Sequence, residues 1–261
     1  MKDSQLNVYN LKQMRQLRPE SFDFVRFDPN NDCNVHCVYC HNHRSKDAVD
    51  TEELRAFLDE NVLTIENFQM GCVMEPTLDK RLTDLMVLIA GSKGRPKKRF
   101  ILQTNGILLH MHDHARMLEA GLNEVSVSID AADAPTHKAL RGGTSIAKVG
   151  SNIAEFRKAC PDVRVTFITT VTRLNLAAMK PLVQFGLDLG VTHFVMREVF
   201  YQPDSNVVDH ARMPELLLKE GEFDKMADEI RSTFGRRAEF DLADNATLER
   251  VNTRMKNDSF R

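Results

Sequence analysis

The chain has 261 residues, 42% of them hydrophobic, and its 35 Lys and Arg residues nearly balance its 37 Asp and Glu residues, giving a formal net charge of -2. This balance gives no sign of a nucleic-acid-binding or membrane surface, and no apolar run approaches the length of a membrane span. The cysteine count of 5 is odd, and residues 1–20 contain no apolar segment long enough for a signal peptide, so we expect a cytoplasmic protein with reduced thiols.

The elements predicted in chain order begin with a short amphipathic helix within residues 1–20, where Leu11, Met14 and Leu17 have helical spacing. An alternating pattern then predicts a strand over residues 22–27 that leads into a loop with three cysteines. From residue 51 onward, helices and strands alternate. The predicted helices span residues 51–62, 78–90, 112–119, 145–159 and 176–189, and the predicted strands span residues 66–73, 99–104, 124–129, 163–171 and 192–200.

Alternating strands and helices indicate parallel βαβ units. Six units are too few for a closed eight-stranded barrel, so we predict a partial, TIM-like (β/α)6 barrel. The regular alternation stops over residues 201–217, and a helix over 220–234 and a short strand over 238–242 follow. We therefore divide the chain into an N-terminal extension (1–21), a barrel core (22–200) and a C-terminal extension packed on the barrel (201–261).

The most specific feature is a loop in which Cys33, Cys37 and Cys40 lie four and three residues apart. Three thiolates brought to one place can hold three irons of a 4Fe–4S cube. Iron–sulfur clusters normally take four cysteines, so the fourth iron would be left without a protein ligand. An open coordination position is typical of reactive metal sites, whereas closed sites are usually structural.

Two other interpretations of this loop stay open. A zinc ribbon would need a second Cys-x2-Cys pair, which the sequence lacks, although a nearby histidine (His36, His41 or His43) would supply a fourth zinc ligand. The spacing could also arise by chance among buried cysteines. Both interpretations are less specific than the three-cysteine cluster loop.

Cys33-x3-Cys37-x2-Cys40, with Tyr39 directly before the last cysteine, resembles the signature of the radical S-adenosylmethionine (radical SAM) enzymes. The resemblance implies two cofactors, a 4Fe–4S cluster and an S-adenosylmethionine that chelates the fourth iron through its amino and carboxylate groups. It also implies a one-electron donor, such as a flavodoxin or ferredoxin, and a 5′-deoxyadenosyl radical that abstracts hydrogen from a substrate. The protein would supply binding and orientation for this chemistry.

The end of the second predicted strand adds to the resemblance. The family usually has Gly-Gly-Glu-Pro there, and its backbone binds the amino group of S-adenosylmethionine. This chain keeps Glu75 and Pro76 but has Val73 and Met74 in place of the two glycines. Gly71 lies nearby and provides some of the lost backbone freedom. Taken alone, Glu-Pro before a helix is a common helix start.

The third strand ends in Thr104-Asn105-Gly106, which recurs at this place in the family and otherwise indicates a turn. Near the end of the sixth strand, Arg197 is a further candidate for a cofactor contact. Both assignments follow the rule that ligands of parallel α/β folds gather at the carboxyl ends of strands.

The fourth strand gives Ser128 and Asp130, and the following helix ends in Arg141-Gly142. The resemblance implies that Ser128 and Arg141 hold the carboxylate of S-adenosylmethionine, for which the arginine fork is well suited. Asp130 would bind the ribose hydroxyls or orient Arg141. Each residue singly also fits a structural role, as a helix cap or a surface arginine.

The substrate does not follow from these motifs, and we expect a small molecule or a peptide. After Cys40 only Cys72 and Cys160 remain, which predicts a single cluster. Tyr39-Cys40-His41-Asn42 resembles the glycyl-radical-enzyme activases, which form the first alternative. A non-catalytic iron–sulfur or zinc-binding module is the second alternative.

The spacing of three histidines resembles that of metal ligands: His110, His112 and His114. We nevertheless expect these side chains to be solvated.

Overall fold

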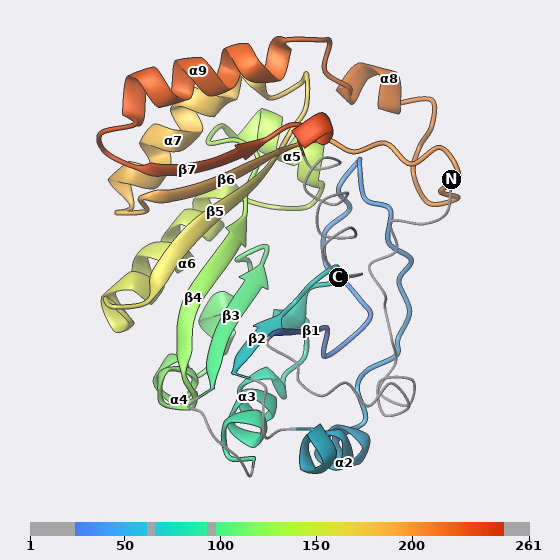
Figure 1. The fold of residues 1–261 in the computed structure, drawn as a ribbon, viewed down its shortest axis with the longest axis vertical. Coiled ribbons are helices and arrows are strands. Elements are labelled where there is room, and N and C mark those ends of the chain that lie inside the picture. The colour runs from blue at the N-terminus through green and yellow to red at the C-terminus, as the bar shows by residue number, and fades with distance from the viewer. Residues whose placement is uncertain (1–23, 62–65, 93–97, 248–261) are drawn as a thin grey trace, which may run out of the picture.

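The computed structural model describes residues 24–61, 66–92 and 98–247. Its centre is one sheet of seven parallel strands that lie in the order of the sequence (Figure 1). The strands are β1 (Phe24–Phe27), β2 (Asn67–Met70), β3 (Arg99–Thr104), β4 (Leu122–Ser128), β5 (Arg164–Val171), β6 (His193–Glu198) and β7 (Glu239–Ala243).

Sequential parallel order is the topology of a barrel rather than of a doubly wound sheet, and β1 and β7 are its two edges. The predicted open, partial barrel is confirmed, with one strand more than its six units, because the short strand predicted over 238–242 forms β7 and pairs with β6. The strand predicted over 66–73 was too long. It ends at Met70, because Gly71 has a φ of 85° and turns the chain out of the ladder.

Helices connect the strands and cover the outer face of the sheet (Figure 1). They are α2 (Thr51–Asn61), α3 (Leu82–Ala90), α4 (His114–Ala120), α5 (Ala134–Arg141), α6 (Ile146–Ala159), α7 (Met179–Asp188), α8 (Met213–Leu216) and α9 (Glu222–Phe234), with 3-10 turns η1 (Pro76–Leu78), η2 (Leu109–Met111) and η3 (Leu176–Ala178). The predicted loop over 201–217 therefore contains a short helix, α8, with Pro214 in its first turn.

Local sequence explains where two helices near the site begin and end. Asp133 caps α5, because its carboxylate accepts a hydrogen bond from the Thr136 amide at 2.8 Å. Ser145 caps α6 in the same way. Between them, Gly142 follows the last residue of α5 with a φ of 40°, so the end of α5 is fixed by glycine.

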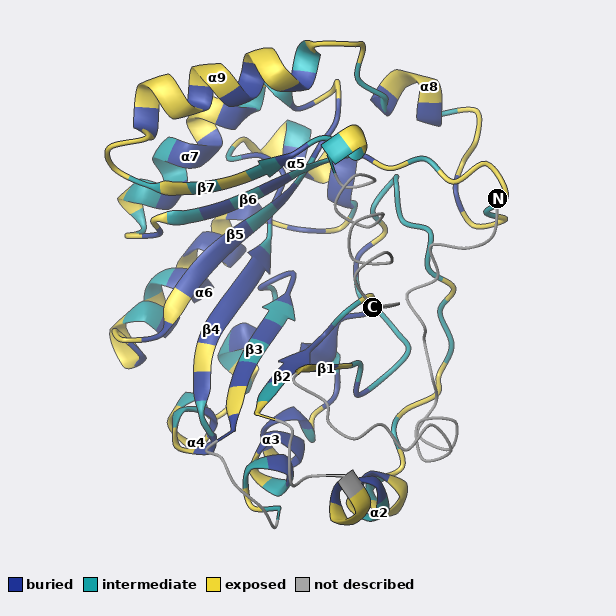
Figure 2. Cartoon of the chain, viewed as in Figure 1, coloured by how far each residue is buried: buried dark blue, intermediate teal, exposed yellow. Residues whose placement is uncertain are grey.

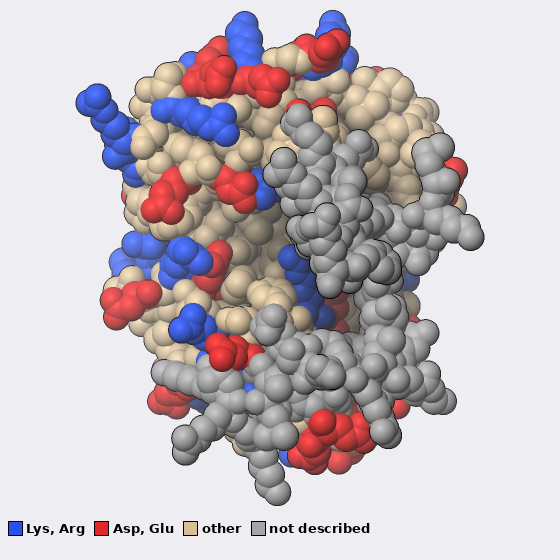
Figure 3. Space-filling model, viewed as in Figure 1, with Lys and Arg blue, Asp and Glu red and all other residues tan. Residues whose placement is uncertain are grey.

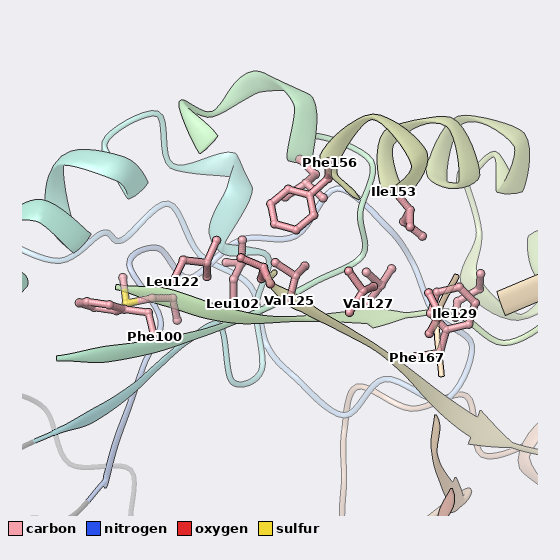
Figure 4. Close-up of a cluster of buried hydrophobic side chains, with 14 of the residues drawn as sticks. Phe100, Leu102, Leu122, Val125, Val127, Ile129, Ile153, Phe156 and Phe167 are labelled. Carbon is pink, nitrogen blue, oxygen red and sulfur yellow. The ribbon is translucent and has the colours of Figure 1, made fainter. Parts of the chain in front are cut away.

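The core lies between the outer face of the sheet and the helices, and buried residues dominate β2, β4 and β5 (Figure 2). Side chains alternate between two faces along a strand. On β3, β4 and β5 the outer face is apolar, and Figure 4 shows its side chains beneath Ile153 and Phe156 of α6. Those strand residues are Phe100, Leu102, Leu122, Val125, Val127 and Phe167. The other face carries polar side chains and is available for a site.

A second apolar cluster lies beside the cysteine loop. Leu140 of α5 packs there with Met213 and Leu216 of α8, and Val38 and Tyr39 from the cysteine loop pack against them. The segment after β6 therefore helps to hold the cysteine loop against α5. This arrangement explains why residues 201–217 are ordered without the strand–helix alternation.

The helix predicted within residues 1–20 lies outside the described residues. Among the helices of the described ranges, none has the length and apolar character needed to cross a lipid bilayer. On the face drawn in Figure 3, basic and acidic side chains are interspersed, which agrees with the near-neutral net charge of the chain.

Candidate functional site

The cysteine loop runs from the end of β1 to α2, and Cys33, Cys37 and Cys40 all line one cavity of about 330 Å³. Side chains from outside the motif hold the loop. The Arg44 guanidinium donates to the Cys33 carbonyl at 2.7 Å and also to the Val35 carbonyl. The cavity also touches β3, β4 and β5 at their carboxyl ends, through Gln103, Thr104, Asn105, Ser128, Ile168 and Thr170.

The C-terminal end of α5 forms one wall for this loop. The Val38 amide donates to the Leu140 carbonyl at 2.9 Å. Gly142 allows the close approach, since a Cβ atom there would lie 2.8 Å from the His36 carbonyl oxygen. A residue with a side chain at position 142 would therefore push the cysteine loop away from α5.

Tyr39, Asp130 and Arg141 form a buried cluster behind the cysteines. The Tyr39 hydroxyl donates to Asp130 Oδ2, and Arg141 Nη1 lies 3.3 Å from the same oxygen and 3.1 Å from the Tyr39 hydroxyl. The other carboxylate oxygen of Asp130 accepts from the Thr170 amide at 3.0 Å. Burial raises the pKa of Tyr39 well above its usual value, so its hydroxyl stays protonated and donates.

Arg141 is buried, and in the described part of the chain its Nε atom has no hydrogen-bond partner. Its side chain lines the cavity beside Ser128. An unsatisfied buried donor on a permanently charged group is costly unless a ligand accepts from it. The arrangement suits an anionic group, such as a carboxylate, at this point of the cavity.

Glu75 organises the opposite wall. Its Oε1 accepts from the Thr77 hydroxyl at 2.5 Å and the Thr104 hydroxyl at 2.6 Å, and its Oε2 accepts from the Asn105 amide at 2.6 Å. Burial raises the pKa of Glu75, against the effect of these donors. Asn105 continues the network into the cysteine loop, because its Nδ2 donates to Asn34 Oδ1 at 2.7 Å.

A comparison with protein families gives one decisive match. The model of the radical SAM superfamily matches residues 28–186, which is more than half of the chain. The chain belongs to the radical SAM superfamily. The resemblance deduced from the cysteine loop is thereby confirmed.

Curated relatives of this radical SAM protein include a probable GTP 3',8-cyclase from Methanococcus aeolicus, 27% identical over 136 residues, which are 50% of this chain and 44% of the relative. An AdoMet-dependent heme synthase from Methanosarcina barkeri is 28% identical over 172 residues, or 62% of this chain and 46% of the relative. The chain thus spans less than half the length of these two relatives.

Solved structures of other radical SAM proteins share the fold. Streptococcus suis SuiB bound to S-adenosylmethionine aligns with 86% of this chain and 50% of its own, with a TM-score of 0.62 and 14% identity. Native anSMEcpe with bound AdoMet and the Cp18Cys peptide aligns with 83% of this chain and 62% of its own, with a TM-score of 0.63 and 19% identity. These identities support the barrel architecture alone.

The cofactors of the superfamily are a 4Fe–4S cluster and S-adenosylmethionine, and the donor set of the cavity fits both. Burial raises the pKa of the Cys37 thiol to about 11 and raises that of Cys33 as well. Metal binding requires the thiolate form and releases the proton. Within the described ranges, no three His, Cys, Asp or Glu side chains converge as a single-ion site. In a 4Fe–4S cluster each thiolate would bind a different iron, so the three cysteines do not need to converge on a single ion.

Not every predicted site residue lines the cavity of this radical SAM protein. Asp130 is fully buried behind it and contacts Arg141 instead. Pro76 is buried at the start of η1, and Gly71 forms the turn out of β2. Arg197 forms an ion pair with Asp241 of β7 and donates to the Asp241 carbonyl at 2.8 Å.

Two of the three histidines that resemble metal ligands, His112 and His114, have structural contacts rather than the solvated positions that we expected. His112 is half-buried and its Nε2 contacts the Thr77 carbonyl at 3.0 Å, and burial lowers its pKa. The ring of His114 packs edge-on against Phe156. Of the two cysteines beyond the motif, Cys160 is buried in the core and Cys72 lines the cavity.

Asp28, Asn34 and Arg44 were not among the residues predicted from the sequence, and Asn42 was named only as part of the tetrapeptide Tyr39–Asn42. Asn34 and Asn42 lie within or beside the cysteine motif, and Asp28 directly follows β1, so the rule about carboxyl ends of strands pointed to it. Arg44 carried no signal, because its role depends on two carbonyls that only the folded loop brings within its reach.

Proposed function

We propose that this protein is a radical SAM enzyme that abstracts a hydrogen atom from a small-molecule or peptide substrate. One observation carries the proposal. The three cysteines and the loop before Glu75 line the same cavity at the carboxyl ends of the strands as Arg141, whose Nε atom has no hydrogen-bond partner among the described residues. In this family the bound cofactors supply reductive cleavage of S-adenosylmethionine to a 5′-deoxyadenosyl radical.

Each group of residues in the cavity would have its own role. Cys33, Cys37 and Cys40 would hold the cluster. Arg141 and Ser128 would bind the carboxylate of S-adenosylmethionine, and the backbone of the loop before Glu75 would bind its amino group. Thr104, Asn105 and Pro76 belong to the frame that holds this loop and the cysteine loop in place. Tyr39 and Asp130 hold Arg141 at the cavity.

Two kinds of similarity support the choice of substrate classes. Two relatives are named as a probable GTP 3',8-cyclase and an AdoMet-dependent heme synthase, and both names refer to small molecules. Streptococcus suis SuiB is known in complex with its precursor peptide SuiA. The activase alternative rests on the tetrapeptide Tyr39–Asn42. We expect a flavodoxin or ferredoxin to supply the electron.

The test is an assay without oxygen. The cluster is rebuilt with iron and sulfide, dithionite and S-adenosylmethionine are added, and 5′-deoxyadenosine is quantified. We expect product from the wild type and from the matched control Cys160→Ala, whose thiol is buried in the core, but none from Cys37→Ala. A fully reconstituted, reduced wild-type protein that forms no 5′-deoxyadenosine would overturn the proposed function.

A further inference from the structure

The loop between β2 and η1 has an unusual set of amide contacts. Four successive amides point toward the end of β1. The Gly71 amide donates to the Phe27 carbonyl at 2.9 Å. The next three, those of Cys72, Val73 and Met74, all donate to the Asp28 carboxylate, at 2.8, 3.2 and 3.2 Å.

Successive amides that surround one point form a concave site for negative charge. Here the chain fills that site with its own carboxylate, because Asp28 directly follows β1 and pairs the loop with that strand end. Val73 and Met74 take the places where the family usually has two glycines, so this loop cannot rely on glycine at those positions. The carboxylate of Asp28 instead fixes the backbone orientation.

The orientation of the amides also fixes that of the carbonyls. In a planar trans peptide the N–H and the preceding C=O point in opposite directions. The carbonyls of Gly71, Cys72 and Val73 therefore point away from Asp28. Side chains already occupy two of them, since the Gln69 amide donates to Gly71 and the Asn42 amide donates to Val73.

Two carbonyls of the loop are left for a ligand. Among the described residues, neither the Cys72 oxygen nor the Met74 oxygen accepts a hydrogen bond, and both residues line the cavity beside the cysteines. Carbonyl oxygens with no partner, near the half-buried carboxylate of Asp28, suit a cationic donor such as an ammonium group.

We propose that Asp28 is the positioning residue for the amino-group subsite: by accepting from the Val73 amide, it aims the free Cys72 carbonyl of this loop at the ammonium group of S-adenosylmethionine. The inference rests on the proposed function and deepens it, because it assigns the subsite to a side chain outside every motif of the sequence. Asp28 acts through the backbone and touches no reacting atom.

The experiment measures binding to the protein with its cluster rebuilt, without oxygen and without reductant. Equilibrium dialysis gives Kd for S-adenosylmethionine and for the analogue in which hydrogen replaces the amino group. We expect Asp28→Asn to weaken S-adenosylmethionine binding about ten-fold, the effect of one charge-assisted hydrogen bond, and to leave the affinity for the analogue unchanged. Asp28→Ala should have the same selectivity and a larger effect.

Asp113→Asn is the matched control, because Asp113 also accepts from a backbone amide, that of Arg116 at 3.1 Å, but caps α4 away from the cavity. It should bind both ligands as the wild type does. Iron content and circular dichroism check the cluster and the fold, and if Asp28→Ala does not fold, Asp28→Asn decides. Equal losses for both ligands, or no loss, would overturn the role of Asp28. A wild type that binds no S-adenosylmethionine would overturn the proposed function as well.

Discussion

Two buried carboxylates stand on opposite sides of the cavity, and their surroundings differ. Glu75, after β2, is bound by uncharged donors, which are two hydroxyls and two backbone amides. Asp130, after β4, is bound by the guanidinium of Arg141 and by the Tyr39 hydroxyl. Both lie at the carboxyl ends of strands, where ligands gather in parallel folds.

The difference shows two ways in which a buried acid contributes to a site. Glu75 accepts hydrogen bonds from the chain around it. It therefore determines the shape of the cavity wall that carries the loop before η1. Asp130 neutralises a buried cation and leaves one face of Arg141 for a ligand. Removal of the first should change backbone positions, and removal of the second should leave an unpaired charge.

The largest effect is expected from Asp130→Ala, because the buried guanidinium of Arg141 loses its counter-ion. Breaking a buried pair from one side costs about 4 kcal/mol of unfolding free energy, measured by urea denaturation followed by circular dichroism. Asp133→Ala, which removes the exposed cap of α5, should cost only about 1 kcal/mol. Equal costs for the two variants would contradict the view that Asp130 acts through charge.

The dependence of stability on pH, through His137, tests the same charged region. Burial, and then the nearby Arg141, lower the pKa of His137 to about 4, against about 6.5 in an unfolded chain. Between these values only the unfolded chain binds the proton, so stability should fall by about 3 kcal/mol as pH drops from 6.5 to 4. Stability measured across this range should change less in His137→Gln. Parallel curves for the two proteins would exclude His137 as the source.

Glu75→Gln should have the smallest of these effects, a loss of about 2 kcal/mol, because the new amide group faces backbone and hydroxyl donors in place of an acceptor. No cation loses its partner. Thermal unfolding gives the cost, and Thr104→Val, which removes one donor, should cost about 1 kcal/mol. If Glu75→Gln cost more than Asp130→Ala, the proposed distinction between the two sides would be wrong.

Several features were predictable because they depend on near neighbours in the sequence. The strand over 99–104 has the predicted bounds, and the helix over 145–159 is off by one residue. Both have a clear apolar period, and Ser145 caps the helix. The cysteine spacing predicted the family, because a loop that presents three thiols to one cluster is itself local. The bounds of β2 and the existence of α8 were missed, since a left-handed glycine and packing against another loop decided them.

The sequence by itself thus determined the superfamily, the open parallel barrel and the cysteines that line the cavity. Only the tertiary structure decided which polar residues meet. Arg197 pairs with Asp241 because β7 lies in register beside β6, and Asp28 reaches the loop after β2 because β1 is the neighbouring strand. The physical reason is the range of the interactions. Capping and periodicity act within a few residues, whereas strand pairing joins residues that are tens of positions apart.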